Sequence, residues 1–176
     1  IRVLAMRLKS QGKYLDQLTD KFIEKMCLAA PLHDIGKVGI PDTILYKNDS
    51  LTKSEWGIMK THTLIGETVL SSTQAQFPDE EVGDVIDVAI QIAGGHHEQW
   101  DGGGYPRGLI GEAIPLSARI MALADMYDAL ISERVYKKEW THEQAVAEIS
   151  KKSRTHFDPA IVEAFLLDKE HFKLIA

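Results

Sequence analysis

Two pairs of adjacent residues in the sequence have side chains that could bind metal ions. His33 and Asp34 place a neutral imidazole beside a carboxylate, which offers one nitrogen ligand and one oxygen group able to bridge two metals. His96 and His97 follow Gly94-Gly95, which could permit an irregular helix end that brings both rings toward one site. The ordinary interpretations are a core histidine with a turn-capping aspartate, and a solvated helix end. Each pair alone is a weak signal.

Three further residues could join such a site. His62 is a lone histidine, which is more often an ordinary helix residue than a ligand. Asp125 lies in an otherwise strongly apolar segment, where a buried carboxylate is costly unless it is paired or binds a metal. Lys37 follows His33 and Asp34 by one helical turn and would share their face, although it could equally be an exposed lysine. Together, four histidines and two aspartates from separate predicted helices suit Fe, Mn or Zn.

The elements that must position these residues are predicted to be helices. Apolar residues recur at helical spacing over residues 1–9, 19–32, 52–59, 62–69, 80–94 and 116–131. Helix starts are marked by capping residues, namely Thr19, Thr52 with Glu55, Thr141 with Gln144, and Asp158 before Pro159. Residues 100–115 are rich in glycine and proline and are predicted to form a long ordered loop that could contain a small hairpin. The pattern therefore predicts an all-α fold.

Length and composition limit the class of protein. The 176 residues suit one domain spanning residues 1–176, and the net charge of −6 opposes broad binding to long nucleic acid. Cys27 is the only cysteine, which excludes a disulfide within the chain and favours a reducing cytoplasm. No apolar run approaches the roughly 20 residues of a membrane span. The chain begins without methionine inside a predicted helix, so we expect this helix to be truncated and the chain to be part of a longer protein.

The candidate residues belong to an ordered series of motifs. In chain order the series comprises His33-Asp34, Gly36-Lys37, His96-His97-Glu98, Trp100-Asp101-Gly102, Gly104-Tyr105-Pro106, Gly108-Leu109, Gly111, Ile114-Pro115, Ala118-Arg119-Ile120, Asp125, Tyr127-Asp128-Ala129-Leu130, Arg134, Tyr136-Lys137 and Phe157-Asp158-Pro159. From residue 29 to residue 165, this series resembles the HD-GYP branch of the HD phosphohydrolase superfamily. The ordered series is far more specific than any of its parts.

The resemblance implies an HD-domain helical bundle in which a metal site lies beside the long Gly/Pro-rich loop. It implies two or three divalent metal ions, most often Fe or Mn, with Zn, Ni and Mg as alternatives. The implied ligands form two sets that share a bridging Asp34: His33, Asp34 and Asp125 in one, and His62, Asp34, His96 and His97 in the other. Family members usually contribute a further histidine from the preceding helix, and Ile1 is expected to begin just beyond that position.

The resemblance also implies hydrolysis of cyclic di-GMP to pGpG or GMP in bacterial signalling. Asp34 and Lys37 would be the catalytic residues, with Lys37 assisting the departing 3′-oxygen. The implied substrate-binding residues are Lys37, Tyr105, Arg134 and Lys137. The implied partners are GGDEF-type domains, bound through the Gly104-Tyr105-Pro106 loop, and a sensor or receiver domain upstream.

Two alternatives to this function stay open at the level of sequence. The same chemistry could act on cyclic GMP-AMP or a nucleotide monoester. A domain without its full metal set could instead bind the dinucleotide, or a protein partner, without turnover. The unbroken run of candidate ligands from His33 to Asp125 favours the enzyme.

Overall fold

The computed structural model describes residues 1–74, 79–132 and 140–175, and helices dominate this part of the chain. Its α-helices are α1 (Arg2–Ser10), α2 (Asp20–Ala29), α3 (Asp42–Leu45), α4 (Lys53–Lys60), α5 (His62–Gln74), α6 (Glu80–Gly95), α7 (Leu116–Ile131), α8 (His142–Lys151), α9 (Pro159–Leu167) and α10 (Lys169–Ile175). Three short 3-10 helices accompany them: η1 (Ala30–Leu32), η2 (Ile35–Gly39) and η3 (Gly111–Ala113). The described residues contain isolated β-bridges but no strands. The predicted all-α fold is confirmed.

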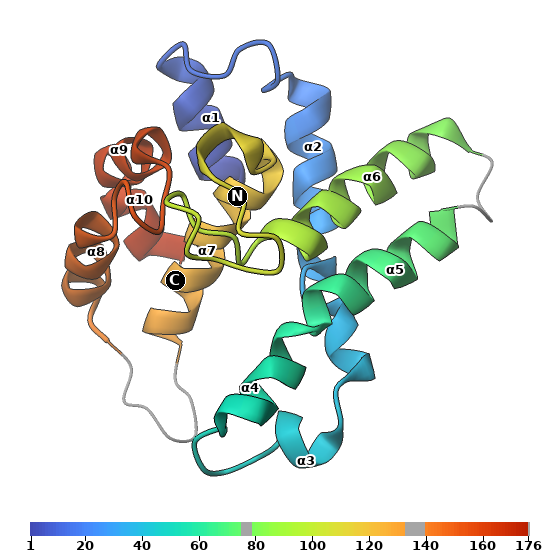
Figure 1. Ribbon diagram of the computed structural model, residues 1–176. Helices are drawn as coiled ribbons and strands as arrows, with labels where there is room; N and C mark the ends of the chain where they lie inside the picture. The colour runs from blue at the N-terminus through green and yellow to red at the C-terminus, as the bar shows by residue number, and fades with distance from the viewer. Residues whose placement is uncertain (75–78, 133–139, 176) are drawn as a thin grey trace.

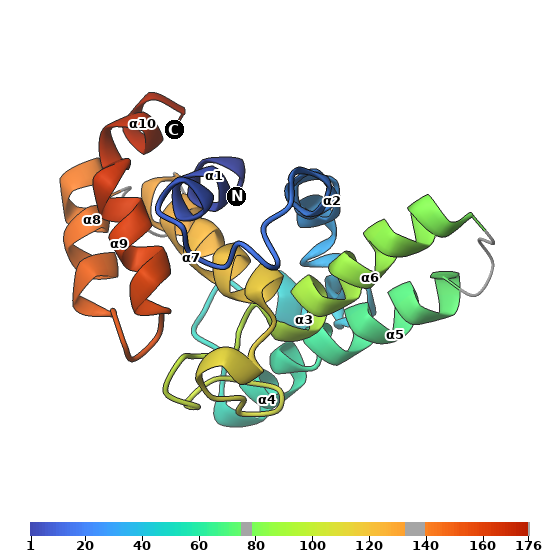
Figure 2. The same ribbon diagram turned by 90° about the horizontal axis from the view of Figure 1, so that it is seen from above.

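The helices form two groups on either side of α7. Helices α5 and α6 lie side by side, and α6 also packs against α2 and α7 (Figures 1 and 2). Helices α8, α9 and α10 gather on the other side of α7, where α1 packs against α9 (Figure 1). The short helices η1 and η2, which follow α2, pack against α6 and α5 respectively. This packing brings the His33-Asp34 segment to the place where α5 begins.

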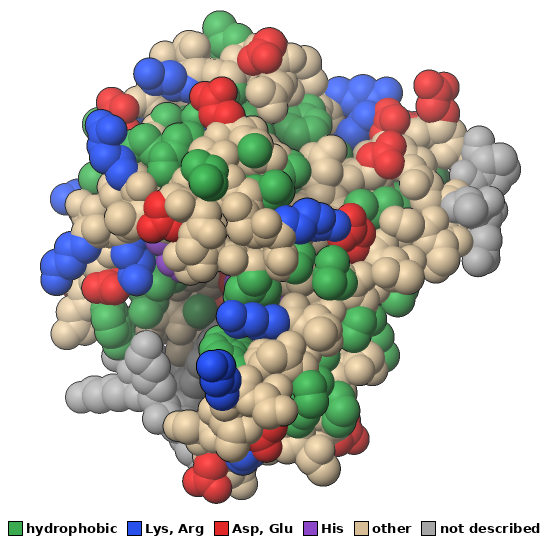
Figure 3. Space-filling model, viewed as in Figure 1, with side chains coloured by type: hydrophobic (Ala, Val, Ile, Leu, Met, Phe, Trp, Pro, Cys, Tyr) green, Lys and Arg blue, Asp and Glu red, His purple; other side chains and the backbone are tan. Residues whose placement is uncertain are grey.

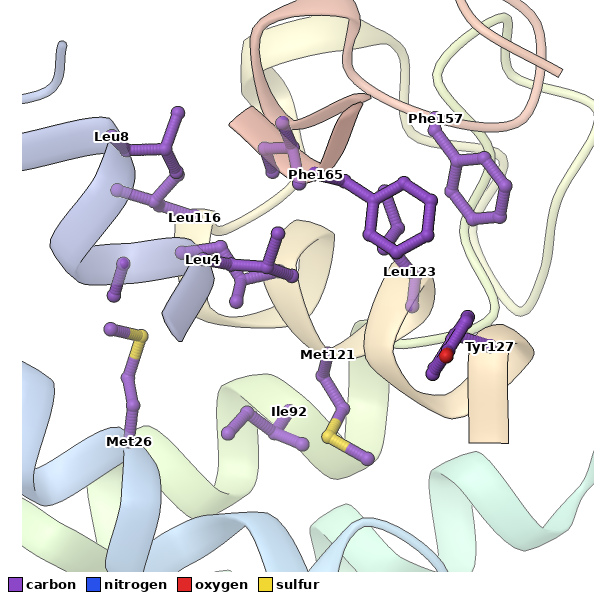
Figure 4. Close-up of a cluster of buried hydrophobic side chains, with 14 of the residues drawn as sticks. Leu4, Leu8, Met26, Ile92, Leu116, Met121, Leu123, Tyr127, Phe157 and Phe165 are labelled. Atoms are coloured by element: carbon purple, nitrogen blue, oxygen red, sulfur yellow. The ribbon is translucent and has the colours of Figure 1, made fainter. Parts of the chain in front are cut away.

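The hydrophobic core fills the space between α1, α2, α6, α7 and α9. Its fully buried side chains include Leu4, Leu8, Met26, Ile92, Leu123 and Phe165 (Figure 4). Burying one such side chain contributes about 1.5–3 kcal/mol to folding. The core therefore fixes α6 and α7, which carry His96 and Asp125, relative to each other.

A buried ion pair reinforces the junction between α7 and α9. The guanidinium of Arg119 donates to the Asp158 carboxylate at 2.7 Å, and these side chains are 5% and 1% exposed. The hydroxyl of Tyr14 donates to the same carboxylate at 2.7 Å. Burial, followed by this hydrogen bond, raises the pKa of Tyr14 to about 12. Asp158 also caps α9 by accepting the N–H of Ala160, as its position before Pro159 predicts.

Two local predictions need correction. The helix predicted over residues 19–32 ends at Ala29 and continues as the 3-10 helix η1, where Pro31 cannot supply the N–H that an α-helix needs. The hairpin considered for residues 100–115 is reduced to one bridge between Asp101 and Ile110. Strand pairing cannot extend there because the N–H groups of Arg107 and Leu109 are bonded to the side chain of Glu98.

The surface carries side chains of both charges. On the face shown in Figure 3, acidic and basic side chains are interspersed over the described residues, with no broad basic patch of the kind that long nucleic acid requires. Within residues 1–74, 79–132 and 140–175, no helix combines the length and the apolar character needed to cross a membrane.

The capping box at the start of α4 provides a first test of the fold. The side chain of Thr52 accepts the N–H of Glu55, and the carboxylate of Glu55 accepts the N–H of Thr52. We expect Thr52→Ala to lower the free energy of unfolding by about 1 kcal/mol, because one helix N–H loses its partner. Urea titration would measure this change. The control is Thr68→Ala on the exposed face of α5, and an equal loss in both variants would contradict the capping role.

Candidate metal centre

His33 and Asp34 lie in the short turn between η1 and η2, and this turn is seated directly on the start of α5. Gly36 makes the contact possible: a Cβ atom at this position would lie 1.8 Å from the carbonyl oxygen of His62 and 2.5 Å from the amide nitrogen of Gly66. A side chain of any size would push η2 away from α5. Glycine is therefore what allows Asp34 to reach His62.

His96 and His97 enter the same space from the end of α6. Helix α6 ends at Gly95, and its C-cap His96 keeps a right-handed helical backbone with φ −67° and ψ −11°. The two imidazole rings lie 4.0 Å apart between centroids. The ring of His62 lies 5.7 Å from that of His96 and 5.1 Å from that of His97. The irregular helix end considered after Gly94-Gly95 is not seen, because both glycines lie within α6 and neither has a positive φ. Gly95 instead allows close packing, since a Cβ there would lie 3.0 Å from the side chain of Ala118.

The potential ligand atoms form two sets that share the Asp34 carboxylate. One atom from each of Asp34, His62, His96 and His97 can be chosen so that all lie within 4.8 Å of one another. Asp34 Oδ1 is 3.5 Å from His62 Nε2 and 3.9 Å from His96 Nε2. On the other side of the carboxylate, His33 Nε2 lies 3.3 Å from Asp34 Oδ2 and 3.6 Å from Asp125 Oδ1. The structure thus brings together all six predicted ligands.

The hydrogen bonds of the histidines decide which nitrogen is available to a metal. Nδ1 of His33 lies 2.9 Å from the carbonyl oxygen of Ala30, and Nδ1 of His62 lies 2.7 Å from that of Met59. Nδ1 of His96 is bonded to a carbonyl oxygen of α6 in the same way. A carbonyl oxygen can only accept, so each Nδ1 carries the proton, and Nε2 of the neutral rings of His62 and His96 presents its lone pair to the site.

The buried polar atoms of the site fit a cation. Asp34 Oδ1, His62 Nε2 and His96 Nε2 are all inaccessible to solvent, and none has a hydrogen-bond partner within the described part of the chain. Lone pairs left in this state are costly, whereas a divalent metal would satisfy all three together. Imidazole nitrogen with carboxylate oxygen is a donor set that suits Fe, Mn and Zn. The residues present therefore fit a metal.

The electrostatics of the site keep Asp34, His96 and His97 in their metal-binding forms. Burial would lower the pKa of His33, but its hydrogen bond with Asp34 outweighs burial and raises that pKa. Burial, with a smaller effect of neighbouring histidines, lowers the pKa of His96 to about 4 and that of His97 to about 2. Burial would raise the pKa of Asp34, but hydrogen bonds from His33 and Lys37 outweigh it and lower that pKa. At neutral pH, His96 and His97 are neutral and Asp34 is an anion.

Asp125 reaches the site, but the prediction that its carboxylate is buried in an apolar helix was wrong. Its side chain is 31% exposed, so it is not a buried carboxylate in an apolar helix. Asp125, Asp128 and His33 line an open pocket of about 390 Å³ beside α7. The side of α7 that carries these aspartates faces this pocket, while the opposite side packs into the core. An apolar average over the segment could not distinguish the two sides.

Of the four predicted substrate-binding residues, Lys37 and Tyr105 lie within the part of the chain that the structure describes. The ammonium of Lys37 donates to Asp34 Oδ2, so Lys37 does share the face of the His33-Asp34 pair. The ring of Tyr105 stacks on that of His97, with centroids 4.8 Å apart and an interplanar angle of 27°. Arg134 and Lys137 lie outside the described residues.

Two residues beside the site, Glu98 and Lys60, were not predicted from the sequence. Glu98 is only 2% exposed and accepts N–H groups from Arg107 at 2.7 Å and Leu109 at 3.0 Å. The ammonium of Lys60 lies 5.0 Å from the centroid of the Tyr105 ring. Glu98 belongs to the motif series, and its place directly after His97 was the only signal. Nothing in the sequence marked Lys60.

Comparisons with known proteins agree with this geometry. A model of the HD domain family matches residues 8–161. The chain is 51% identical over 176 residues to a probable cyclic di-GMP phosphodiesterase of Vibrio cholerae, covering all of this chain and 40% of that protein. It is 46% identical over 154 residues to a cyclic di-GMP phosphodiesterase of Thermotoga maritima, covering 87% of this chain and 40% of that protein.

Other relatives are named for a different cyclic dinucleotide. A 3′3′-cGAMP-specific phosphodiesterase of Vibrio cholerae is 44% identical over 144 residues, which are 82% of this chain and 26% of that protein. The crystal structure of a cyclic GMP-AMP specific phosphodiesterase from V. cholerae superposes with a TM-score of 0.62 at 20% identity, covering 99% of this chain and 44% of that one, and shows the same fold. The chain spans 40% or less of the length of these curated relatives. It belongs to the HD domain family, in the HD-GYP type of HD phosphohydrolase domain that its motif series predicts.

Proposed function

We propose that this domain hydrolyses a phosphodiester bond of a cyclic dinucleotide, with cyclic di-GMP as the preferred substrate. The observation that carries the proposal is the pair of donor sets sharing Asp34, one with His62, His96 and His97 and the other with His33 and Asp125. Relatives of 44–51% identity named as cyclic di-GMP phosphodiesterases support the substrate class.

We propose that the metals are two or three divalent ions, Fe or Mn, with Zn, Ni or Mg as alternatives. When bound, such ions neutralise phosphate oxygens and lower the pKa of water toward about 7. Asp34 and the imidazoles of His62, His96 and His97 would hold one ion. His33, Asp34 and Asp125 would hold the other.

The remaining residues are proposed to handle the substrate. The net charge of −6 means that local cations must attract the phosphates. Lys37 already lies beside Asp34, where its ammonium could bind a non-bridging oxygen and then protonate the departing 3′-oxygen. Arg134 and Lys137 are proposed to bind phosphate oxygens as well. Tyr105, stacked on His97, would form the wall against which the substrate lies.

The setting of the domain is also a proposal. We place it in the bacterial cytoplasm, where Cys27 would stay reduced, and within a longer protein that carries a sensor or receiver domain. A GGDEF-type domain is the proposed protein partner of the Gly104-Tyr105-Pro106 loop. The names of the relatives also support cyclic GMP-AMP as an alternative substrate.

One observation favours a second function, that of a receptor without turnover. The set His33, Asp34 and Asp125 offers fewer protein ligands than the other set, and it opens onto a pocket. If only one ion binds tightly, we propose that the domain binds the dinucleotide without cleaving it, because the two-metal mechanism needs both ions.

Metal removal and reconstitution test the proposed function. We expect the chelated protein to have no activity on cyclic di-GMP, and Mn²⁺ or Fe²⁺ under reducing conditions to restore it. The melting temperature should rise as well, because an ion at ~100 times its Kd contributes about 2.7 kcal/mol. Chromatography of the products and metal analysis would follow both effects. If metal-loaded protein binds cyclic di-GMP and leaves it intact, the domain is a receptor and not an enzyme. If it cleaves cyclic GMP-AMP faster than cyclic di-GMP, cyclic GMP-AMP is the preferred substrate.

A further inference from the structure

Glu98 is a buried carboxylate that the proposed chemistry does not use. It follows His97 at the end of α6, where its own N–H is bonded to the carbonyl oxygen of Gly95 at 3.0 Å. Each carboxylate oxygen accepts one N–H of the glycine-rich loop: Oε1 from Arg107 and Oε2 from Leu109. A carboxylate withdrawn from water is costly unless it is bonded in this way, and charge-assisted bonds are about twice as strong as neutral ones. Glu98 therefore restrains this loop strongly.

The restrained loop is the one that covers His97. The N–H of Tyr105 donates to the carbonyl oxygen of His97 at 3.1 Å, and the two rings stack. Gly104 lets the loop approach closely, since a Cβ there would lie 2.5 Å from the Cα of Glu98 and 2.3 Å from the amide nitrogen of Gln99. Residues 104–109 thus lie directly on residues 97–99.

A second side-chain contact that holds this loop is more exposed. The guanidinium of Arg107 pairs with Glu67, and these side chains are 43% and 29% exposed. Solvent-exposed ion pairs are screened and contribute little. Among the side-chain contacts of Arg107 and Leu109, the bonds of Glu98 therefore involve the most buried partner.

We propose that Glu98 is a positioning residue that holds Tyr105 against His97 and so fixes the wall of the substrate site. In this proposal Glu98 acts through the backbone of the loop. It contacts neither the histidine nitrogens that would bind metal nor the substrate. The inference rests on the proposed function for its catalytic consequence. The restraint on the loop can be measured without any substrate.

The restraint predicts an alternating pattern of amide exchange in the unmodified protein. Arg107 and Leu109 donate their N–H groups to Glu98, whereas Gly108 between them makes no N–H hydrogen bond to any described residue. We expect slow hydrogen exchange at Arg107 and Leu109 and fast exchange at Gly108, measured by NMR on the 176-residue protein with Zn²⁺ as a diamagnetic ion. Equally fast exchange at all three amides would overturn the proposal.

The variant Glu98→Gln tests the consequence for the site. Glutamine has nearly the same shape but replaces one acceptor by an NH₂ donor, which would face a backbone N–H. We expect exchange at residues 107 and 109 to become about ten-fold faster, the bound metal to be retained, and KM to rise about ten-fold with a smaller change in kcat. The matched control is Glu112→Gln, an exposed glutamate of the same loop, which should change none of these.

Each outcome of this comparison decides something. Unchanged exchange in Glu98→Gln, or unchanged KM despite faster exchange, overturns the positioning role. Loss of metal from the variant also overturns it, since Glu98 would then act on the metal ligands. If the unmodified protein lacks turnover, the proposed function fails while the exchange measurements still decide the role of Glu98. Should Glu98→Gln not fold, the exchange pattern of the unmodified protein decides it.

Discussion

Replacing Asp34 by asparagine is expected to abolish turnover and remove bound metal together. Asp34 is the carboxylate shared by both donor sets, with Oδ1 toward His62 and Oδ2 toward His33. Asparagine keeps the volume of the side chain but supplies one neutral oxygen in place of a carboxylate oxygen. Its other terminal group is NH₂, and this group cannot bind a cation. Loss of residues that merely orient a ligand costs about 10–100-fold in metal affinity, so loss of this shared ligand should cost ~100-fold or more. Metal analysis after gel filtration and a product assay would measure both effects.

Two controls separate this result from a general loss of structure. Asp16→Asn removes an exposed carboxylate from the loop before α2 and should change neither metal content nor activity. Arg134→Ala should keep the metal and weaken substrate handling, through loss of a charge-assisted contact of about 1.5–3 kcal/mol. Equal metal loss in Asp34→Asn and Arg134→Ala would contradict the proposed division between metal and phosphate residues. Retention of full metal by Asp34→Asn would contradict the shared ligand itself.

The sequence predicts those parts of the structure that depend on local rules. The capping boxes of α4 and α8 form as their spacing predicts, because each involves residues three positions apart. The Gly94-Gly95 step before the paired histidines lies within α6 and gives no irregular helix end, so this local prediction was wrong. The six candidate ligands come together because their motif series, taken as a whole, is specific even though each part is weak.

The parts that sequence reasoning missed depend on contacts between distant segments. The partners of Glu98 are backbone N–H groups, which every residue carries and no pattern distinguishes. The exposure of Asp125 depends on which side of α7 packs into the core, and that follows from the arrangement of neighbouring helices. Gly36 was recognised as part of a motif, but its packing against α5 is visible only in three dimensions.

Gly36→Ala is expected to be the most damaging of the glycine-to-alanine changes, because its added Cβ would make the shortest contact of any. Gly36 is not among the glycines with positive φ, so close approach alone demands glycine there. The added Cβ would meet the backbone of His62 and Gly66, which cannot rotate away as a side chain could. Overpacking usually costs about 1–3 kcal/mol, and backbone contacts this short should place Gly36→Ala at about 3 kcal/mol or above.

The test is a comparison of three glycine-to-alanine variants by urea unfolding and metal binding. Gly57→Ala has no atom within 4 Å of its new Cβ and lies inside α4, so it should stabilise the protein by up to about 1 kcal/mol. Gly39→Ala would meet only the side chain of Ile65, at 3.0 Å, and should have an intermediate effect because that side chain can adjust. Gly36→Ala must separate η2 from α5 or fail to fold, and in either case Asp34 leaves His62 and metal is lost. A stable Gly36→Ala variant that binds metal normally would show that the seat of the His33-Asp34 turn on α5 does not position the site.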